Sequence, residues 1–225
     1  MIFRFCNIQE DELARTGTKQ RILNTSLMLF NQLGTPDSST NHIALELEIS
    51  PGNLYYHYPN KEQLIETLFS NYEVALQPLT NQSFTEPLSI EDIWFFLHLN
   101  FELALEYRFI YQDTDYITLK CPSLAAKFQS LLTEFFRTLV RLLTALLETG
   151  VLKVPSKTII EDISLNMLLI CTQWIHFKKH LSGISEANIS GDHFNQGIYQ
   201  ALSILLPYLD QAHQEHLLHL REAYQ

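Results

Sequence analysis

The chain has three cysteines, no long apolar run and little positive charge, and each shortage excludes a class of protein. Cys6, Cys121 and Cys171 are odd in number and far apart, so neither a disulfide framework nor a zinc site is indicated. No apolar run approaches the roughly 20 uncharged residues that a membrane span needs. The N-terminal residues also lack the apolar stretch of a signal peptide before an acidic cluster at 10–12. We therefore expect a cytoplasmic protein with no membrane partner.

Catalytic signatures are missing as well. The sequence has no Gly-rich phosphate loop, no G-x-S-x-G motif, and no compact Cys/His or paired-carboxylate constellation. We therefore predict neither an enzyme nor a bound cofactor. Of the 225 residues, 46% are hydrophobic and only 18% are charged, which indicates a globular chain with a sizeable core.

The segment from Ser38 to Lys61 predicts two short helices joined by a tight turn. Ser38 or Ser39 can cap the first helix by accepting a hydrogen bond from an unpaired backbone amide. Small and apolar residues then recur on one helical face and can pack inward: Ile43, Ala44 and Leu47. The turn follows at Glu48 and Ile49, and we expect Ile49 to be buried.

The second helix is expected to begin after Ser50, with Pro51 at the first helical position, where a missing N–H costs nothing. Four consecutive residues cannot all face inward on one helix. With Leu54 as the inward anchor, we expect the next three residues to point outward: Tyr55, Tyr56 and His57. The competing interpretation is an ordinary packing helix, because aromatic residues usually serve the core. The Ser-Pro-Gly start instead favours close approach to another backbone, as a helix in the DNA major groove requires.

This segment resembles the DNA-binding domain of the TetR/AcrR family of bacterial regulators. The similarity runs from Thr18 to about Asn71, about a quarter of the chain. It is carried by Arg21-Ile22-Leu23, Leu29-Phe30, Gly34, Ile43-Ala44, the run Ser50-Pro51-Gly52-Asn53-Leu54-Tyr55-Tyr56-His57-Tyr58, and Lys61. On this resemblance, the DNA contacts are Ser39, Thr40, Asn41, Ser50, Pro51, Gly52, Asn53, Tyr55, Tyr56, His57 and Lys61.

The resemblance implies a homodimer that binds a palindromic operator in double-stranded DNA. Family members usually repress transcription and release the DNA when a small molecule enters the C-terminal domain. One residue departs from the family pattern, because Glu48 stands in the turn where many members have a small residue, often Gly. A carboxylate is unfavourable so close to a DNA-binding face.

Helical periodicity without any β-hairpin signature predicts an all-α fold. We expect a disordered N-terminal extension at 1–17. A three-helix helix-turn-helix domain with its linker helix is expected at 18–77, and a larger helical effector-binding and dimerisation domain at 78–225. Outside the motif, helices are expected at 19–33, 61–76, 89–109, 124–149, 155–181, 191–209 and 211–223.

The C-terminal half contains a stretch at 94–98 that is apolar around most of the helix, which is typical of burial on several sides. A plain core explains it as well as a ligand pocket does, and the family resemblance favours the pocket. Its expected ligand is hydrophobic, and its expected lining is Trp94, Phe95, His98, Phe101, Glu102, Tyr107, Tyr111, Phe128, Gln173 and Trp174. The resemblance also places the dimer interface on two late helices, with candidate contacts Met167, Ile170, Trp174, Ile198, Leu202 and Leu205.

The net charge of −10 is unusual for a DNA-binding protein. Residues 1–77 contain five lysines and arginines and nine aspartates and glutamates, although no residue from Ile49 to Asn60 is acidic. We therefore expect operator affinity to depend only weakly on salt. The acidic balance also supports an alternative, a helical interaction protein of this fold that has lost sequence-specific DNA binding. The series His213, His216 and His219 drifts around its helix, so we predict no metal site.

Overall fold

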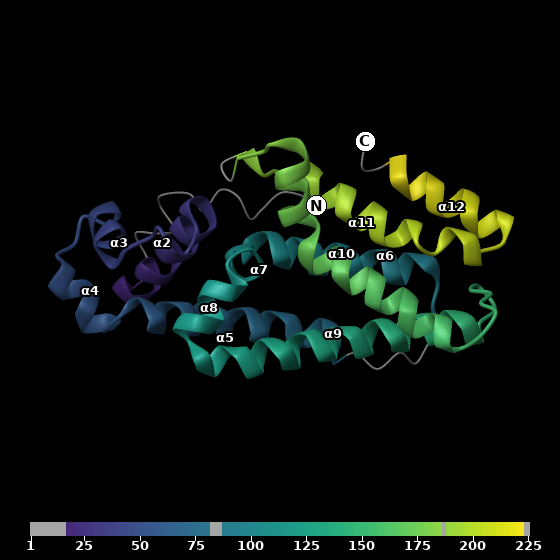
Figure 1. Ribbon diagram of the computed structural model, residues 1–225, viewed down its shortest axis with the longest axis horizontal. Coiled ribbons are helices and arrows are strands. Elements are labelled where there is room, and N and C mark those ends of the chain that lie inside the picture. Colours follow the sequence, from purple (N-terminus) through teal and green to yellow (C-terminus); the bar gives the residue numbers. More distant parts are fainter. Residues whose placement is uncertain (1–16, 82–86, 186–187, 223–225) are drawn as a thin grey trace.

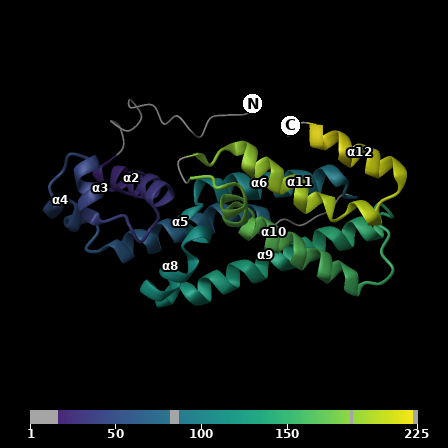
Figure 2. The same cartoon turned by 45° about the horizontal axis from the view of Figure 1, so that its top comes forward.

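The computed structural model describes residues 17–81, 87–185 and 188–222. Within them the secondary structure is helical, with one isolated bridge between Leu152 and Leu209, so the all-α prediction is confirmed. The helices are α2 (Thr18–Leu33), α3 (Thr40–Glu46), α4 (Pro51–His57), α5 (Lys61–Thr80), α6 (Ile90–Glu106), α7 (Phe109–Gln112), α8 (Thr114–Lys120), α9 (Pro122–Glu148), α10 (Thr158–Ser182), α11 (Gly191–Ser203), η2 (Leu206–Tyr208) and α12 (Gln211–Glu222). The molecule is elongated, with α4 at one end and α12 towards the other (Figures 1 and 2). No helix in the described ranges could cross a membrane.

Two helix boundaries differ from the sequence prediction. Helix α5 does not end before Pro78 but continues to Thr80, because a proline in the last turn removes only one backbone donor. The carbonyl of Thr80 then accepts hydrogen bonds from the Thr138 hydroxyl (3.3 Å) and the Arg141 guanidinium, both on α9. The expected helix at 89–109 divides into α6 and α7. Its predicted start is confirmed, since the Asp92 carboxylate accepts a hydrogen bond from the Ser89 backbone N–H at 2.7 Å.

The break between α6 and α7 is held by a side chain from the N-terminal part of the chain. Asn31 of α2 is buried and uses both ends of its amide there. Its Nδ2 donates to the carbonyl oxygen of Glu106 (2.7 Å), and its Oδ1 accepts from the backbone N–H of Phe109 (3.1 Å). One residue therefore satisfies two backbone groups that the end of one helix and the start of the next leave unpaired.

The apolar residues form two cores. The first joins α2–α5 with α7, α8 and the start of α9, so it includes residues on both sides of the boundary expected at 77/78. The second joins α6, α10, α11 and the rest of α9, and Leu217 of α12 packs against it. Tyr111 of α7 contacts both cores. Its hydroxyl lies 2.6 Å from that of Tyr72 on α5, and burial raises the pKa of both phenols, so both stay neutral.

Within the second core, Gly197 of α11 lies where this helix packs against α6 and α10. A Cβ atom at this position would lie 2.6 Å from ring atoms of both Phe101 and Trp174. The Trp174 ring is also fixed by its Nε1–H, which donates to the carbonyl oxygen of His193 at 2.7 Å. The helices can therefore pack at this distance only around a residue without a side chain.

Candidate DNA-binding surface and sensor cavity

The two helices of the motif are begun by local hydrogen bonds. The Ser39 hydroxyl caps α3 by accepting from the His42 backbone N–H (3.1 Å), and Ser50 caps α4 by accepting from the Asn53 backbone N–H (3.2 Å). The neighbouring Ser38 is buried and instead donates to the carbonyl oxygen of Gly34 at 2.8 Å. The sequence therefore sets both helix starts through its serines, and Pro51 occupies the first position of α4.

Apolar side chains fix the rear of both helices. Ile43, Ala44 and Leu47 are buried, and Leu54 is fully buried beneath α4. Ile49, expected to be buried, is only half-buried at the rim of the first core. These anchors leave α4 no freedom to turn its opposite face inward.

The opposite face of α4 is exposed. Tyr56 keeps 84% of its surface and Tyr55 keeps 45%, while His57 is half-buried with its ring edge-on to Tyr56 at 5.1 Å between centroids. The Tyr55 hydroxyl lies 3.0 Å from the Thr40 hydroxyl, which ties α4 to the start of α3. Tyr58, which follows His57, is buried, and desolvation raises the pKa of its phenol. The tyrosine-rich run thus divides between solvent and core, which excludes the simple packing-helix interpretation.

The remaining predicted contact residues are accessible, and one of them is engaged by the protein itself. Ser39, Asn41, Ser50, Pro51, Gly52 and Asn53 are exposed, and Thr40 is half-buried. Lys61 differs, because its ammonium group donates to the carbonyl oxygens of Thr35 (2.6 Å) and Ser38 (2.9 Å) and lies 5.0 Å from the centre of the Tyr116 ring. The assignment of Lys61 to the DNA contacts is therefore corrected. Its charge is used to hold the loop that leads into α3.

Glu48 in the turn has a left-handed backbone, with φ of 54°. A left-handed conformation costs a residue with a Cβ atom about 1–2 kcal/mol, and glycine avoids this cost. This geometry explains why glycine suits the position and shows that the chain tolerates glutamate there at some expense in stability.

Replacing Glu48 by Gly is therefore expected to maintain or raise the free energy of unfolding, by up to about 1 kcal/mol after the greater flexibility of unfolded glycine is subtracted. Glu46 provides the matched control, because it is exposed and ends α3. Replacing Glu46 by Gly should cost up to about 1 kcal/mol. Urea denaturation measures both changes, and a loss of stability in the Glu48 variant as large as that of the control contradicts the prediction.

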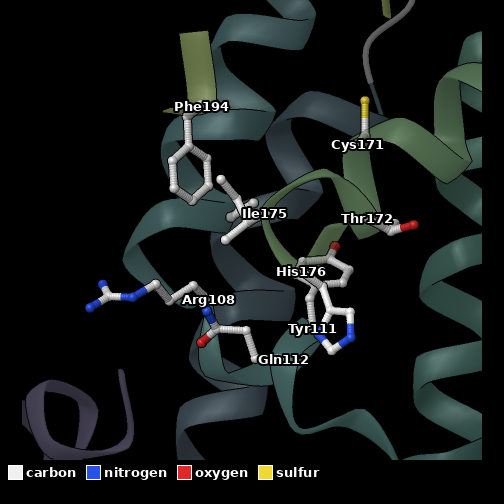
Figure 3. Close-up of a pocket in the computed structure, with 9 residues that line it drawn as sticks. Arg108, Tyr111, Gln112, Cys171, Thr172, Ile175, His176 and Phe194 are labelled. Carbon is white, nitrogen blue, oxygen red and sulfur yellow. The ribbon is translucent and has the colours of Figure 1, made fainter. Parts of the chain in front are cut away.

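A small cavity lies where α6, α7, α10 and α11 meet (Figure 3). It has a volume of about 20 Å³ and is lined by Ala104, Arg108, Tyr111, Gln112, Cys171, Thr172, Ile175, His176 and Phe194. Burial raises the pKa of the Cys171 thiol, so this group is neutral. Drug-sized ligands occupy roughly 300–1,000 Å³, so a ligand of that size requires the surrounding helices to move apart.

Only Tyr111 of the expected pocket residues lines this cavity. Phe95, Glu102 and Gln173 are exposed, which corrects their assignment to a pocket. The others pack elsewhere: the Trp94 and His98 rings stack on each other, Phe101 and Trp174 meet around Gly197, Tyr107 packs on Tyr72, and Phe128 packs on Phe69 and Tyr111. The lining was missed because it comes from helices far apart in the sequence, with no local motif to mark it.

The predicted dimer contacts are mostly internal. Met167, Ile198, Leu202 and Leu205 are buried in the second core of their own chain, which corrects this assignment. Ile170 and Trp174 are half-buried against the same core. The exposed apolar residues of α10 are instead Leu165, Leu169, Phe177 and Leu181. They are spaced by four or eight positions, so consecutive members lie near each other on the helix surface, while the series turns by about 160° around the helix from Leu165 to Leu181.

The C-terminal histidines make contacts within the chain. His213 Nδ1 lies 2.7 Å from Asp210 Oδ1, and His216 Nε2 lies 2.6 Å from Glu91 Oε1 on α6. Among the described residues, no group of three or more histidine, cysteine or acidic side chains is placed to hold a metal ion.

Two family profiles match consecutive parts of the chain. Residues 22–68 match the profile described as bacterial regulatory proteins, tetR family, and residues 71–217 match the profile described as bacterial transcriptional repressor. Among curated proteins, a probable HTH-type transcriptional regulator, YttP from Bacillus subtilis, is 28% identical over 109 residues, which cover 44% of this chain and 51% of YttP. The match therefore spans about half the length of that relative.

Solved structures extend the similarity to nearly the whole chain. A TetR-family transcriptional regulator from Marinobacter aquaeolei is 33% identical, with a TM-score of 0.83, and the match covers 93% of this chain and all of that one. A putative transcriptional regulator from Saccharomonospora viridis in complex with choline shares the fold at 18% identity, with a TM-score of 0.62 over 82% of this chain and 95% of its own. The protein described here belongs to the TetR family of transcriptional regulators and carries the family's DNA-binding helix-turn-helix.

Proposed function

We propose that this protein is a repressor that binds a palindromic operator as a homodimer and releases it when a hydrophobic small molecule binds. The observation that carries the proposal is the division of α4 between a fully buried Leu54 and a largely exposed Tyr56. Helix α4 lies at one end of the molecule (Figure 1). A helix anchored from behind and exposed in front can enter a major groove. A twofold dimer would present two such helices, separated by one helical turn of DNA or a multiple of it.

The apolar stripe on α10 supports the homodimer. Leu165, Leu169, Phe177 and Leu181 each expose more than half of their surface and extend over four turns of the helix. Extended exposed apolar surface on a folded protein marks an interaction site. The same stripe on a second copy would cover it in an isologous contact, in which each patch meets itself across the twofold axis.

The position of the cavity supports control by a ligand. Arg108, Tyr111 and Gln112 line it, and they belong to the segment that also holds α2 through Asn31. The same segment ends at Asp113, whose carboxylate accepts a hydrogen bond from the Thr35 backbone N–H at 2.5 Å. A ligand that enlarges the cavity by displacing this segment would also shift the loop that leads into α3. Apolar walls at Ala104, Ile175 and Phe194 suit a ligand with a hydrophobic body, and the bound choline of the Saccharomonospora viridis protein shows that this fold accepts small organic molecules.

Operator binding is tested with a duplex from the region upstream of the protein's own gene. Replacing Tyr56 by Ala should weaken binding at least tenfold, because it removes the exposed ring proposed to face the DNA. The fold should be unaffected, since this side chain contributes little to the core. Replacing Phe95 by Ala is the matched control, since it removes an exposed aromatic ring from α6. Fluorescence anisotropy measures both affinities, and thermal unfolding checks that each variant is folded. A wild-type protein that does not bind the duplex specifically supports the alternative, a helical interaction protein that does not read DNA, whereas equal affinities for the wild type and the Tyr56 variant would show that Tyr56 does not contact the DNA.

The salt dependence of operator binding should be shallow. Of the three basic residues in 18–77, Lys61 is bonded to loop carbonyls, which leaves Lys19 and Arg21. If both residues of each protomer neutralise a phosphate, the slope of log affinity against log salt is about −4. Anisotropy titrations at several salt concentrations give this slope, and a value two or three times steeper contradicts the prediction.

A further inference from the structure

The first turn of α4 offers one side chain that can bond to a base. The N-terminal residues of a recognition helix are those that reach base edges in the major groove. Pro51 and Gly52 are exposed but have no side-chain donor or acceptor. Asn53 is exposed, and its backbone N–H is already bonded to Ser50. Within the described part of the chain, the Asn53 carboxamide has no hydrogen-bond partner, so both its donor and its acceptor are available.

Of the first three residues of α4, only Asn53 has a polar side chain. Tyr56 lies three positions further along the same helical face, and its ring contacts His57. The Tyr55 hydroxyl is engaged with Thr40. No lysine or arginine occurs from Thr40 to Asn60, so this surface lacks the side chains that most often form paired hydrogen bonds with guanine.

The chemistry of the carboxamide selects the base. Adenine presents an acceptor at N7 beside a donor at N6, and an asparagine side chain matches them with its NH₂ group and its oxygen. Guanine presents acceptors at both N7 and O6, so the amide oxygen would face another acceptor. We propose that Asn53 reads one adenine in each operator half-site through N6 and N7. The proposal rests on the operator-binding function above and adds a fixed A·T pair to each half of the palindrome.

The test begins with selection of bound duplexes from a random library by the wild-type protein. Each adenine of the selected operator is then replaced by 7-deazaadenine, which lacks the N7 acceptor. One adenine in each half-site should prove sensitive, with a loss of affinity of roughly 5- to 150-fold for each contact. Asn53→Ala removes the contact from both half-sites, so its loss on the unmodified operator should equal or exceed that of the wild type on an operator modified at both sensitive adenines, and it should show no further loss on that modified operator.

Asn41→Ala is the matched control, because it removes the same exposed amide from the first turn of α3. It should keep the wild-type sensitivity to 7-deazaadenine, because the Asn53 amide is still present. A selected operator without a sensitive adenine, or an Asn53→Ala protein that keeps full sensitivity, overturns the adenine assignment and leaves the regulator intact. If the wild-type protein enriches no sequence at all, the proposed function fails as well.

Discussion

Replacing Asn31 by Ala is expected to lower the free energy of unfolding by about 2–6 kcal/mol. The substitution leaves the backbone N–H of Phe109 and the carbonyl of Glu106 without their partner, which lies 3.1 Å and 2.7 Å away in the wild type. Each buried backbone group left unsatisfied costs about 1–3 kcal/mol. The loss is large because one side chain serves two such groups and joins α2 to the break between α6 and α7. Urea denaturation followed by circular dichroism measures the effect.

Gln20 provides the control for this prediction. It lies on the same helix, is exposed, and forms a side-chain hydrogen bond with Asn24 at 2.9 Å. Replacing Gln20 by Ala should change stability by no more than about 0.5 kcal/mol, as for most surface substitutions. If the Asn31 and Gln20 variants unfold at the same urea concentration, the Asn31 contacts do not stabilise the junction.

Replacing Leu169 by Glu is expected to convert the proposed dimer to monomers. Leu169 lies in the middle of the exposed stripe on α10, with 59% of its surface accessible in the single chain. In a twofold contact, the substitution would bury a carboxylate from each protomer without a partner. An uncompensated buried charge costs about 3–5 kcal/mol, so the dimer dissociation constant should rise more than 100-fold. Sedimentation velocity over a range of concentrations measures this shift, and operator affinity should fall with it.

Leu119 provides the control for the stripe. It is an even more exposed leucine, on α8 and outside the stripe. Replacing Leu119 by Glu should change neither the sedimentation profile nor the affinity for the operator. A Leu169 variant that remains dimeric would show that α10 does not form the interface, whereas dissociation of both variants would indicate a wider contact surface.

Sequence alone predicted the helix-turn-helix well because its determinants are local. A serine hydroxyl caps a helix only three residues away, and proline suits only the first helical turn, so Ser39, Ser50 and Pro51 set the boundaries of α3 and α4. The outward direction of Tyr55 and Tyr56 followed from Leu54 being the inward anchor. The same local reasoning placed α9 and α12 within a few residues of their observed limits.

The tertiary structure decided the features that depend on distant residues. Lys61 follows the motif in sequence, yet its ammonium group is bonded to the loop at Thr35 and Ser38, more than 20 residues earlier. The cavity likewise assembles from α6, α7, α10 and α11, and no stretch of sequence contains more than a few of its residues.

Helix α10 shows most clearly which features the sequence can predict and which depend on tertiary packing. It has leucine, isoleucine or methionine at 167–170 without a break, so periodicity alone could not separate an inner from an outer face. Packing against α9 and α11 buried Met167 and left Leu169 in solvent. The sequence by itself determined that this helix is apolar and where α4 begins and ends. Which apolar residues remain free for a second copy depended on neighbours that only the folded chain brings together.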